Sequence, residues 1–539
     1  MLSYGGDMAT EQNFGDNFYL KTFLIGFGIV CAVWSFMIFQ FWWGNHDWGY
    51  LKSGVSLSSG FFEARYSQHL PTILFFDGHI LPFFTLFCAL GCLAIESMFI
   101  AKYLDVPKSF KNYLFFVLFM GLNPYVATLF YFLYLSFVYV FWSLTGIFLL
   151  FLTEKQYKWY HLLTGGLLFF LILGSYPPNI ALILVLFVTK RLIQYVNGKE
   201  NIWNTICRSM YFVTMLGFGY MGFRLAYTYI LQKGYINLDM YNIAIKGVFD
   251  AVKALATELS GSVTQLFHQH SFMEFSYCFL LSILILTAVL VSLSYKKNKF
   301  ILILFIVAIF LSSRFCFIIG ADVSAGIFRI EYWSRLGLTI FALGVLLRQS
   351  NNKINNFLFV WGILAVALFI NTDFYIQKIR YLEFSANRQY QARQIDKITM
   401  QPMFNLEPKY ISLSFGYPVF YVKYMKDKNH SGDIAGVAPI FDFDEINQLF
   451  WEEKVSPVVI GAGIWGINNV LRADRAGNGK WQDGNYWRNN PNNVESIKYW
   501  LYTKAKYNSV YVDDKYILMV MSLPHFYKYR ETVVNKLDK

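Results

Sequence analysis

Long, uninterrupted apolar segments constrain this chain more than any other feature of its sequence. The stretch 18–43, FYLKTFLIGFGIVCAVWSFMIFQFWW, can cross about 30 Å of hydrocarbon as a helix, and 300–313 is nearly long enough to do so. Such continuous runs exclude an outer-membrane barrel, because the strands of a barrel alternate apolar and polar side chains. With 56% hydrophobic and 15% charged residues, the chain holds more apolar surface than a soluble core could bury. The sequence therefore predicts an α-helical polytopic membrane protein.

Basic residues between the apolar segments predict how the chain crosses the membrane. Lys and Arg are retained on the inner face, and they gather in five short connectors: 102–111, 155–158, 190–191, 296–299 and 348–353. Placing all five inside makes GLNPY (121–125) and GSYPPN (174–179) the outer tips of helical hairpins, because Pro and Gly interrupt helices. This alternation predicts about eleven transmembrane helices, with the amino terminus inside and the last span at about 357–371.

The sequence predicts two domains. Residues 1–371 form the transmembrane domain, which includes a first outside loop at 44–75, and residues 372–539 form a C-terminal domain on the outer side. This tail alternates strand-like runs, such as 409–416 and 516–522, with helix-like runs. That pattern is typical of a small mixed α/β domain.

Cofactors, metals and nucleic acids are not expected as partners. The stretch GAGIWG (461–466) has the letters of a dinucleotide-binding loop, but no second strand ending in an acid follows it, so we expect a glycine-rich turn. All six cysteines lie in apolar segments, and the pair His268 and His270 lacks a third metal ligand nearby. The net charge of +12 is explained by the inner connectors and a solvated tail. It is also compatible with contact to anionic membrane lipids or an anionic glycan.

The first outside loop carries the strongest candidate for chemistry. In NHDWGYLKSGVSLSSGFFEARY (45–66), Asp47 follows a span by a few residues and is flanked by His46 and Trp48. A partly desolvated carboxylate at this depth could accept a proton from an acceptor hydroxyl, and Glu63 is a second candidate acid. Helix capping or simple solvation is the alternative for Asp47. Glu63 could also form a local ion pair with Arg65.

Other polar residues are predicted at the outer ends of the spans. Asp77 and His79 form an uncommon polar pair in FFDGHILP. Asn123 and Tyr176 lie at the two hairpin tips, where they could line a substrate pocket or merely cap helices. In the tail, WQDGNYWRNNPNN (481–493) offers Trp481, Tyr486 and Trp487, which could stack on an acceptor glycan or belong to an ordinary surface loop.

Four stretches of the chain resemble a known superfamily. They are NHDW with FFEARY downstream, LNPYVATLFYFLYLS, GSYPPNIAL and FINTDFYIQKIRYLEFSANRQYQARQIDKI, spread over 45–400. The chain resembles the GT-C polytopic glycosyltransferases and, more narrowly, the bacterial and phage glucosyltransferases that decorate O-antigen and cause serotype conversion. It departs from that pattern twice. His46 precedes Asp47 where paired acids are usual, and no acid follows the NPY tip.

The resemblance implies a reaction and a place for it. A hexose, expected to be glucose, would move from undecaprenyl phosphate to O-antigen or a related lipid-linked glycan on the periplasmic face of the bacterial inner membrane. Asp47 would act as the base, and no nucleotide pocket or metal would be needed. The donor phosphate would be held by arginines, whose forked guanidinium suits it. The candidates are Arg329, Arg335, Arg65 and Arg224.

Alternatives remain open on the sequence alone. Arg335 could instead pair with Glu331 one turn earlier. Another GT-C transferase or a glycan polymerase would present the same pattern. A lipid-linked sugar flippase or transporter is a different class, but the chain shows none of the internal repeats that such proteins carry.

Overall fold

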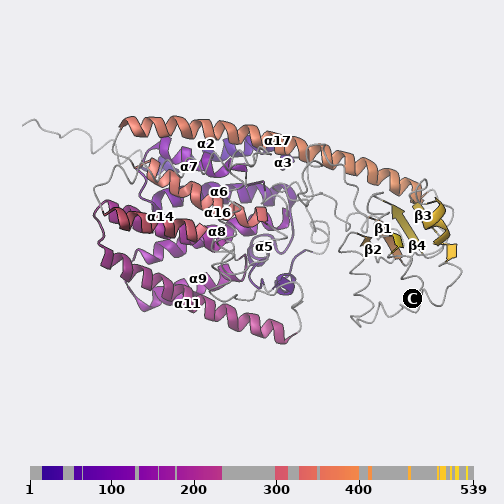
Figure 1. Ribbon diagram of the computed structural model, residues 1–539, viewed down its shortest axis with the longest axis horizontal. Helices are drawn as coiled ribbons and strands as arrows, with labels where there is room; N and C mark the ends of the chain where they lie inside the picture. The colour runs from indigo at the N-terminus through magenta and orange to yellow at the C-terminus, as the bar shows by residue number, and fades with distance from the viewer. Residues whose placement is uncertain are drawn as a thin grey trace, which may run out of the picture. The chain divides into compact units, whose positions relative to one another are not determined.

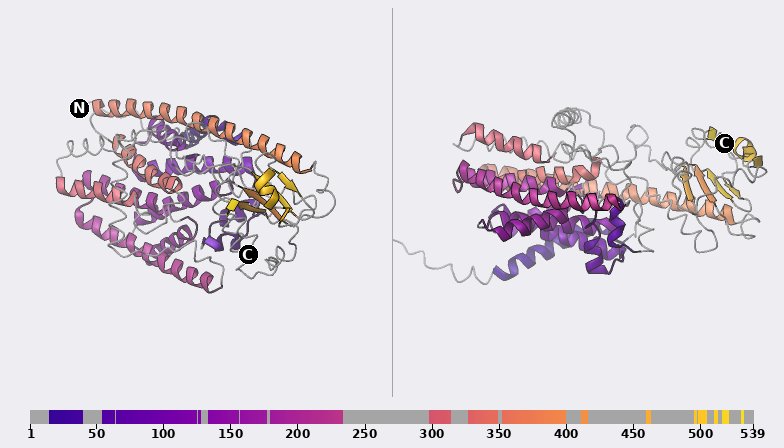
Figure 2. Two further views of the ribbon diagram at one scale, coloured as in Figure 1. Left: turned by 45° about the vertical axis from the view of Figure 1, so that its right-hand side comes forward. Right: turned by 90° about the horizontal axis from the view of Figure 1, so that it is seen from below.

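Helices dominate the computed structural model, which divides into a helical unit that extends to Gln377 and a second unit that carries a small sheet (Figures 1 and 2). Each unit is described by itself. The structure describes residues 15–39, 54–63, 65–124, 126–127, 133–155, 157–176, 179–233, 298–313, 327–348 and 352–399, and in the tail 411–415, 459–462, 495–496, 498–504, 510–512, 516–520 and 530–531.

The helices follow the apolar runs, and local signals set several of their ends. Pro82 lies in the first turn of α6, where its missing N–H is not needed, and the Ser109 side chain accepts a hydrogen bond from the Asn112 N–H to cap α7. The helical elements are α2 Gly15–Val33, α3 Ser35–Phe39, η1 Leu57–Glu63, α5 Leu70–Phe76, α6 Pro82–Tyr103, α7 Phe110–Gly121, α8 Leu133–Thr153, α9 Trp159–Leu173, α10 Asn179–Val196, α11 Ile202–Gln232, α14 Lys299–Ser313, α16 Ile327–Leu346 and α17 Asn352–Thr399.

Among the described residues, four helical segments are long and apolar enough to cross a membrane: Phe83–Tyr103, Leu133–Thr153, Asn179–Val196 and Asn356–Lys378. Shorter apolar helices accompany them at Phe18–Val33, Phe110–Gly121, Trp159–Leu173 and Lys299–Ser313. These segments confirm a helical membrane protein. The total of about eleven spans stays a prediction.

Close helix contacts are made at small residues. In the pair α9 and α11, a Cβ added at Gly219 would come within 2.7 Å of the Gly166 carbonyl oxygen, so only glycine allows this approach. Small residues serve this purpose in membranes, where lipid tails are as apolar as Leu and close packing must hold helices together. The glycines therefore fix how α9 and α11 meet, side by side at one edge of the helical unit (Figure 1).

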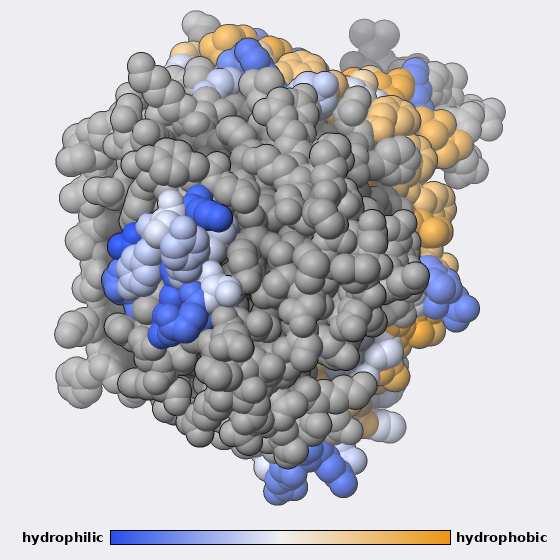
Figure 3. Space-filling model, turned by 90° about the vertical axis from the view of Figure 1, so that its right-hand side faces the viewer, coloured by the Kyte–Doolittle hydropathy of each residue, from blue (hydrophilic) through white to orange (hydrophobic). Residues whose placement is uncertain are grey.

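Large hydrophobic side chains are exposed on the outward faces of several helices. Leu225 of α11 is 75% exposed and Trp159 of α9 is 72% exposed, while α2 and α17 show Leu24 and Val360 in the same way. Figure 3 shows hydrophobic side chains along the margin of one face of the molecule. In a membrane protein such faces meet lipid rather than water.

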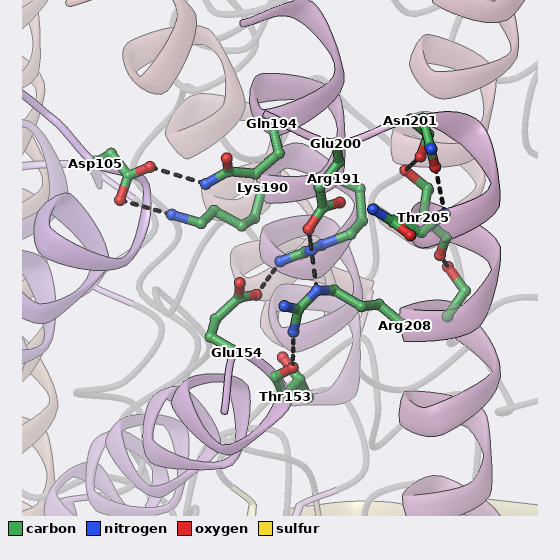
Figure 4. A network of polar contacts seen from close by, with 12 residues as sticks. Asp105, Thr153, Glu154, Lys190, Arg191, Gln194, Glu200, Asn201, Thr205 and Arg208 are labelled. Atoms are coloured by element: carbon green, nitrogen blue, oxygen red, sulfur yellow. Dashed lines mark hydrogen bonds and ion pairs between the residues drawn. The ribbon is translucent and has the colours of Figure 1, made fainter. Parts of the chain in front are cut away.

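Three of the five predicted inner connectors meet at one end of the helical unit, called here the inner end and defined by Asp105, Glu154, Lys190, Arg191 and Glu200 (Figure 4). Lys190 Nζ lies 2.7 Å from Asp105, and Arg191 pairs with both Glu154 and Glu200. These residues come from the ends of α6, α8 and α10 and from the connector to α11. The opposite end, which carries the segment 54–81 and both hairpin tips, is called the outer end.

The second unit contains a four-stranded sheet of order β2-β1-β4-β3. Its strands are β1 Ile411–Phe415, β2 Val459–Ala462, β3 Val510–Val512 and β4 Tyr516–Val520. β1 pairs in parallel with β2 and β4, whereas β3 is antiparallel to β4. The strand-like runs expected at 409–416 and 516–522 therefore form β1 and β4. The extent of an α/β domain over 372–539 stays a prediction.

Candidate functional site

The second half of the first outside loop forms a compact turn that presents Arg65. The 3-10 helix η1 ends at Glu63, and the Arg65 N–H donates to the Gly60 carbonyl at 2.8 Å. A Cβ at Gly60 would collide with the Arg65 carbonyl oxygen, so this position requires glycine. This hydrogen bond and the close approach at Gly60 thus fix the position of the Arg65 backbone.

Arg65 lies over an aromatic stack. Its guanidinium carbon is 5.4 Å from the centre of the Tyr176 ring, and Tyr176 in turn stacks on Tyr139 of α8 with ring centres 4.2 Å apart. Asn179 helps to place this stack by donating from Nδ2 to the Tyr139 carbonyl at 3.3 Å. A guanidinium over a ring face is attracted by the ring's quadrupole. The structure therefore brings together two residues that the sequence singled out separately, Arg65 and Tyr176.

The loop is anchored to the second hairpin by three hydrogen bonds. The Tyr66 hydroxyl donates to the Phe170 carbonyl at 2.7 Å, the Ser67 N–H to the Gly174 carbonyl at 3.0 Å, and the Ser67 hydroxyl to the Leu171 carbonyl at 2.5 Å. Carbonyls near the end of a helix lack a partner within the helix, and the loop supplies one to Leu171 and Gly174. The Phe170 carbonyl accepts both the Tyr66 hydroxyl and the Gly174 N–H. Burial raises the pKa of Tyr66, so its hydroxyl stays protonated and remains a donor.

His69 is a buried residue of this loop that sequence reasoning missed. It precedes α5, is 2% exposed, and stacks on Tyr134 with ring centres 5.9 Å apart. Burial, and secondly the positive charge of Arg65, lower the pKa of His69 to about 4. His69 is therefore neutral at physiological pH. The only signal in the sequence was its place directly before Leu70-Pro71, where α5 starts.

Asp77 and His79 belong to an exposed turn. Asp77 ends α5 in the left-handed conformation with φ 51°, and its side chain and that of His79 are exposed. Gly78 follows at φ 76°, and its carbonyl accepts the Val55 N–H at 2.8 Å. The pair closes the base of the loop.

Asn123 and Arg224 lie on separate elements of the outer end. Asn123 is fully buried just after α7, and its carbonyl accepts the Val126 N–H at 2.8 Å. Arg224 is an exposed residue of α11, with its guanidinium 5.8 Å from the Tyr227 ring centre. Tyr227 packs with Ile230 in a cluster that also contains Tyr66 of the loop. Arg224 is thus on the stretch of α11 that contacts the loop.

For several candidates the structure describes the backbone but not the side chain. Glu63 is the last residue of η1, and Arg329 and Arg335 lie in the first half of α16. Outside the described residues lie His46, Asp47 and Trp48 in the first part of the loop and Trp481, Tyr486 and Trp487 in the tail.

Metal ligands do not gather in the part of the chain that the structure describes, since no group of three His, Cys, Asp or Glu residues is found there. A different buried acid was also missed by sequence reasoning. Asp373 of α17 is fully buried, and it lies within the stretch FINTDFYIQKIR that carried part of the family resemblance.

Comparison with known proteins yields one family. The family model described as Glucosyl transferase GtrII matches residues 56–334, just over half of the chain. This range includes Arg65, His69, both hairpin tips and the start of α16. No curated protein gives a significant match to the chain.

Proposed function

Because the chain belongs to the glucosyl transferase GtrII family, we propose that it moves glucose from polyprenyl phosphate to a glycan on the outer face of the bacterial inner membrane. The acceptor is O-antigen or a related lipid-linked glycan. The observation that carries the proposal is the docking of the first outside loop on the second hairpin, which places Arg65 over Tyr176 within the matched range. A cation held at the outer end suits a donor that presents a phosphate there.

The donor phosphate requires cations that keep their orientation. Stacking on Tyr176 restricts the side chain of Arg65, so less rotamer entropy is lost when its guanidinium binds an anion. Arg224, Arg329 and Arg335 are the further candidates in this proposal. They lie on α11 and α16, whose outward ends are on the same side of the membrane as the loop in the predicted topology.

Transfer is a displacement at the anomeric carbon of the donor sugar. The acceptor hydroxyl oxygen forms the new bond to that carbon, and the bond from the carbon to the phosphate oxygen breaks. The electron pair of the broken bond leaves with polyprenyl phosphate, and the hydroxyl proton passes to the carboxylate of Asp47. The arginines offset the charge that develops on the phosphate.

The first test uses membranes that contain the protein and labelled glucosyl polyprenyl phosphate. We expect the wild type and a matched control, Asp16→Asn at the start of α2, to transfer label to glycan. Asp47→Asn at equal abundance should be at least about 100-fold slower, which is the usual contribution of a general base.

The outcomes separate the parts of the proposal. Unchanged transfer by Asp47→Asn would move the role of base to Glu63. Transfer from a nucleotide sugar without lipid would refute the proposal that glucosyl polyprenyl phosphate is the donor. Absence of transfer to any glycan by the wild type would favour the flippase alternative.

A second test addresses Arg65. Arg65→Gln removes the cation while keeping a hydrogen-bonding side chain, so we expect a higher KM for the donor and little change in KM for the acceptor. Lys199→Gln is the matched control, because Lys199 is an exposed cation at the inner end. Equal donor KM values for the two variants would remove Arg65 from the phosphate site.

A further inference from the structure

Asp373 of α17 is a buried carboxylate that has no hydrogen-bond partner within the described part of the chain. Its exposed fraction is 0%, and neither carboxylate oxygen accepts a hydrogen bond from any residue that the structure describes. Burying a carboxyl group without a partner is strongly unfavourable. Residues that break such a rule in a folded membrane protein point to function rather than stability.

A second buried carboxylate shows what a structural role looks like in the same chain. Glu96 of α6 is also 0% exposed, but the Ser143 hydroxyl of α8 donates to its Oε1 at 2.5 Å. This bond links two helices that pack along their length. Asp373 has no such bond to a neighbouring helix, so helix pairing does not explain it.

The neighbour of Asp373 one turn along α17 places it at the outer end. Gln377 donates from Nε2 to the Val33 carbonyl at 2.8 Å and accepts the Met37 N–H at Oε1 at 3.2 Å. Val33 and Met37 are the last residue of α2 and a residue of α3, directly before the first outside loop in sequence. Asp373 therefore lies one helical turn from the contacts that α17 makes with the last described residues before that loop.

Ring contacts place Asp373 level with the first hairpin tip. Phe119 of α7 packs against Phe369 of α17 with ring centres 5.1 Å apart, and Phe115 packs against Phe359 in the turns before. The two helices thus run in the same direction. Asn123 and Asp373 each follow the Phe119–Phe369 contact by four residues, and both are fully buried.

The chemistry of the missing partner is constrained. In its ionised form the carboxylate only accepts hydrogen bonds, so a ligand that binds it in that form must be a donor, and a phosphate diester has neither a donor nor an attractive charge to offer. Sugar hydroxyls are donors, and a pyranose presents several of them. In a protein that transfers a hexose at this end of the membrane, a sugar ring is the ligand that fits.

We propose that Asp373 binds substrate by accepting hydrogen bonds from hydroxyl groups of a pyranose ring. This inference rests on the proposed function and extends the site beyond residues 56–334, the range that the family model matches. Because Asp373 is covered here, the sugar reaches it only after the residues around it move apart. The ring belongs either to the donor glucose or to the acceptor glycan.

The test combines Asp373→Asn with deoxy sugars. For the wild type, kcat/KM is measured with donors and acceptors that each lack one hydroxyl. Removing the hydroxyl that Asp373 binds should lower kcat/KM by about 10- to 100-fold, the range for a hydrogen bond to a charged group. In Asp373→Asn, the same deoxy compound should have the same kcat/KM as the parent sugar. Removing any other hydroxyl should lower kcat/KM as much as it does in the wild type. Sensitivity to a deoxy donor assigns the ring to the donor, and sensitivity to a deoxy acceptor assigns it to the acceptor.

Stability measurements separate binding from folding. Asp373→Asn should keep or raise the Tm in detergent, because it replaces a carboxyl group that has no partner. Glu96→Gln is the matched control and should leave the pattern of deoxy effects as in the wild type. A large fall in Tm for Asp373→Asn, or an equal loss with every deoxy compound, would overturn the inference and make Asp373 structural. If the wild type transfers no hexose at all, the proposed function fails first and the inference fails with it.

Discussion

The inner and outer ends of the helical unit are held together by different interactions. At the inner end, charged side chains pair with one another: Lys190 with Asp105, Arg191 with Glu154 and Glu200. At the outer end, the loop is held by aromatic rings and by bonds to backbone carbonyls of α9. Charges that neutralise each other contribute to structure. The outer end instead places a guanidinium over a ring, where it is oriented for an anion. We therefore expect inner-end substitutions to lower stability and outer-end substitutions to alter the site.

The largest expected effect tests the inner end. Arg191→Leu leaves Glu154 without its cation and leaves Glu200 with Arg208 alone, and both carboxylates are largely buried. Breaking a buried pair from one side costs about 3–5 kcal/mol of unfolding free energy. Chemical denaturation in detergent measures this loss. The exposed control Lys199→Gln should change the free energy by less than about 0.5 kcal/mol. Equal stability of the two variants would mean that the network is not what holds the inner end.

The second prediction concerns pH and the outer end. Since the folded pKa of His69 is about 4 and the unfolded value is about 6.5, folding favours the neutral imidazole. This contribution to the free energy of unfolding is fully present above pH 6.5 and is lost as the pH falls towards 4. The loss amounts to about 3 kcal/mol at pH 4. His69→Gln should lose less stability than the wild type between pH 7 and pH 4 in matched denaturation curves. Parallel curves would show that His69 titrates as an exposed histidine does.

The third prediction concerns the contact between the loop and the second hairpin. Gly174→Ala places a methyl group inside the Tyr66 ring, so the ring must move, and overpacking of this kind costs about 1–3 kcal/mol. Adding Tyr66→Leu should recover part of this loss. Gly28→Ala in α2 is the control, because nothing lies within 4 Å of its added Cβ. If both glycine variants have the same Tm, the loop does not pack on the hairpin in this way.

The smallest effect isolates one hydrogen bond. Tyr66→Phe keeps the ring on Phe170 but removes the hydroxyl that donates to the Phe170 carbonyl. We expect a loss of about 1 kcal/mol, the usual net value of such a bond. Tyr229→Phe, at a 61% exposed tyrosine of α11, should be neutral. A loss shared by both variants would trace the effect to something other than this bond.

Local signals in the sequence predicted the elements of the fold and part of the site. Continuous apolar runs predicted the helices, and Pro and Gly marked the ends of α7 and α9, because these residues act on the backbone nearest to them. Arg65 and Tyr176 were both predicted at the outer end, and the structure places one over the other. The strand-like runs of the tail likewise predicted β1 and β4.

The sequence could not predict which polar residues are buried or which side chains touch, because these features depend on which helices pack together. His69 and Asp373 are ordinary polar residues until the packed structure shows that both are buried, His69 against Tyr134 of α8. Gly174 is an ordinary turn glycine until Tyr66 is known to lie against it.

By itself, the sequence determined that this protein is built of membrane helices joined by short basic connectors, because hydrophobicity and charge act on each segment separately. That these connectors share one side of the membrane stays a prediction. It also carried the resemblance to a glucosyltransferase family, which the match over residues 56–334 confirms. Only the tertiary structure decided which charges neutralise each other at the inner end, which ring Arg65 covers, and that Asp373 is buried with no hydrogen-bond partner among the residues that the structure describes. These are contacts between residues far apart in the chain, and such contacts exist only once the helices have packed.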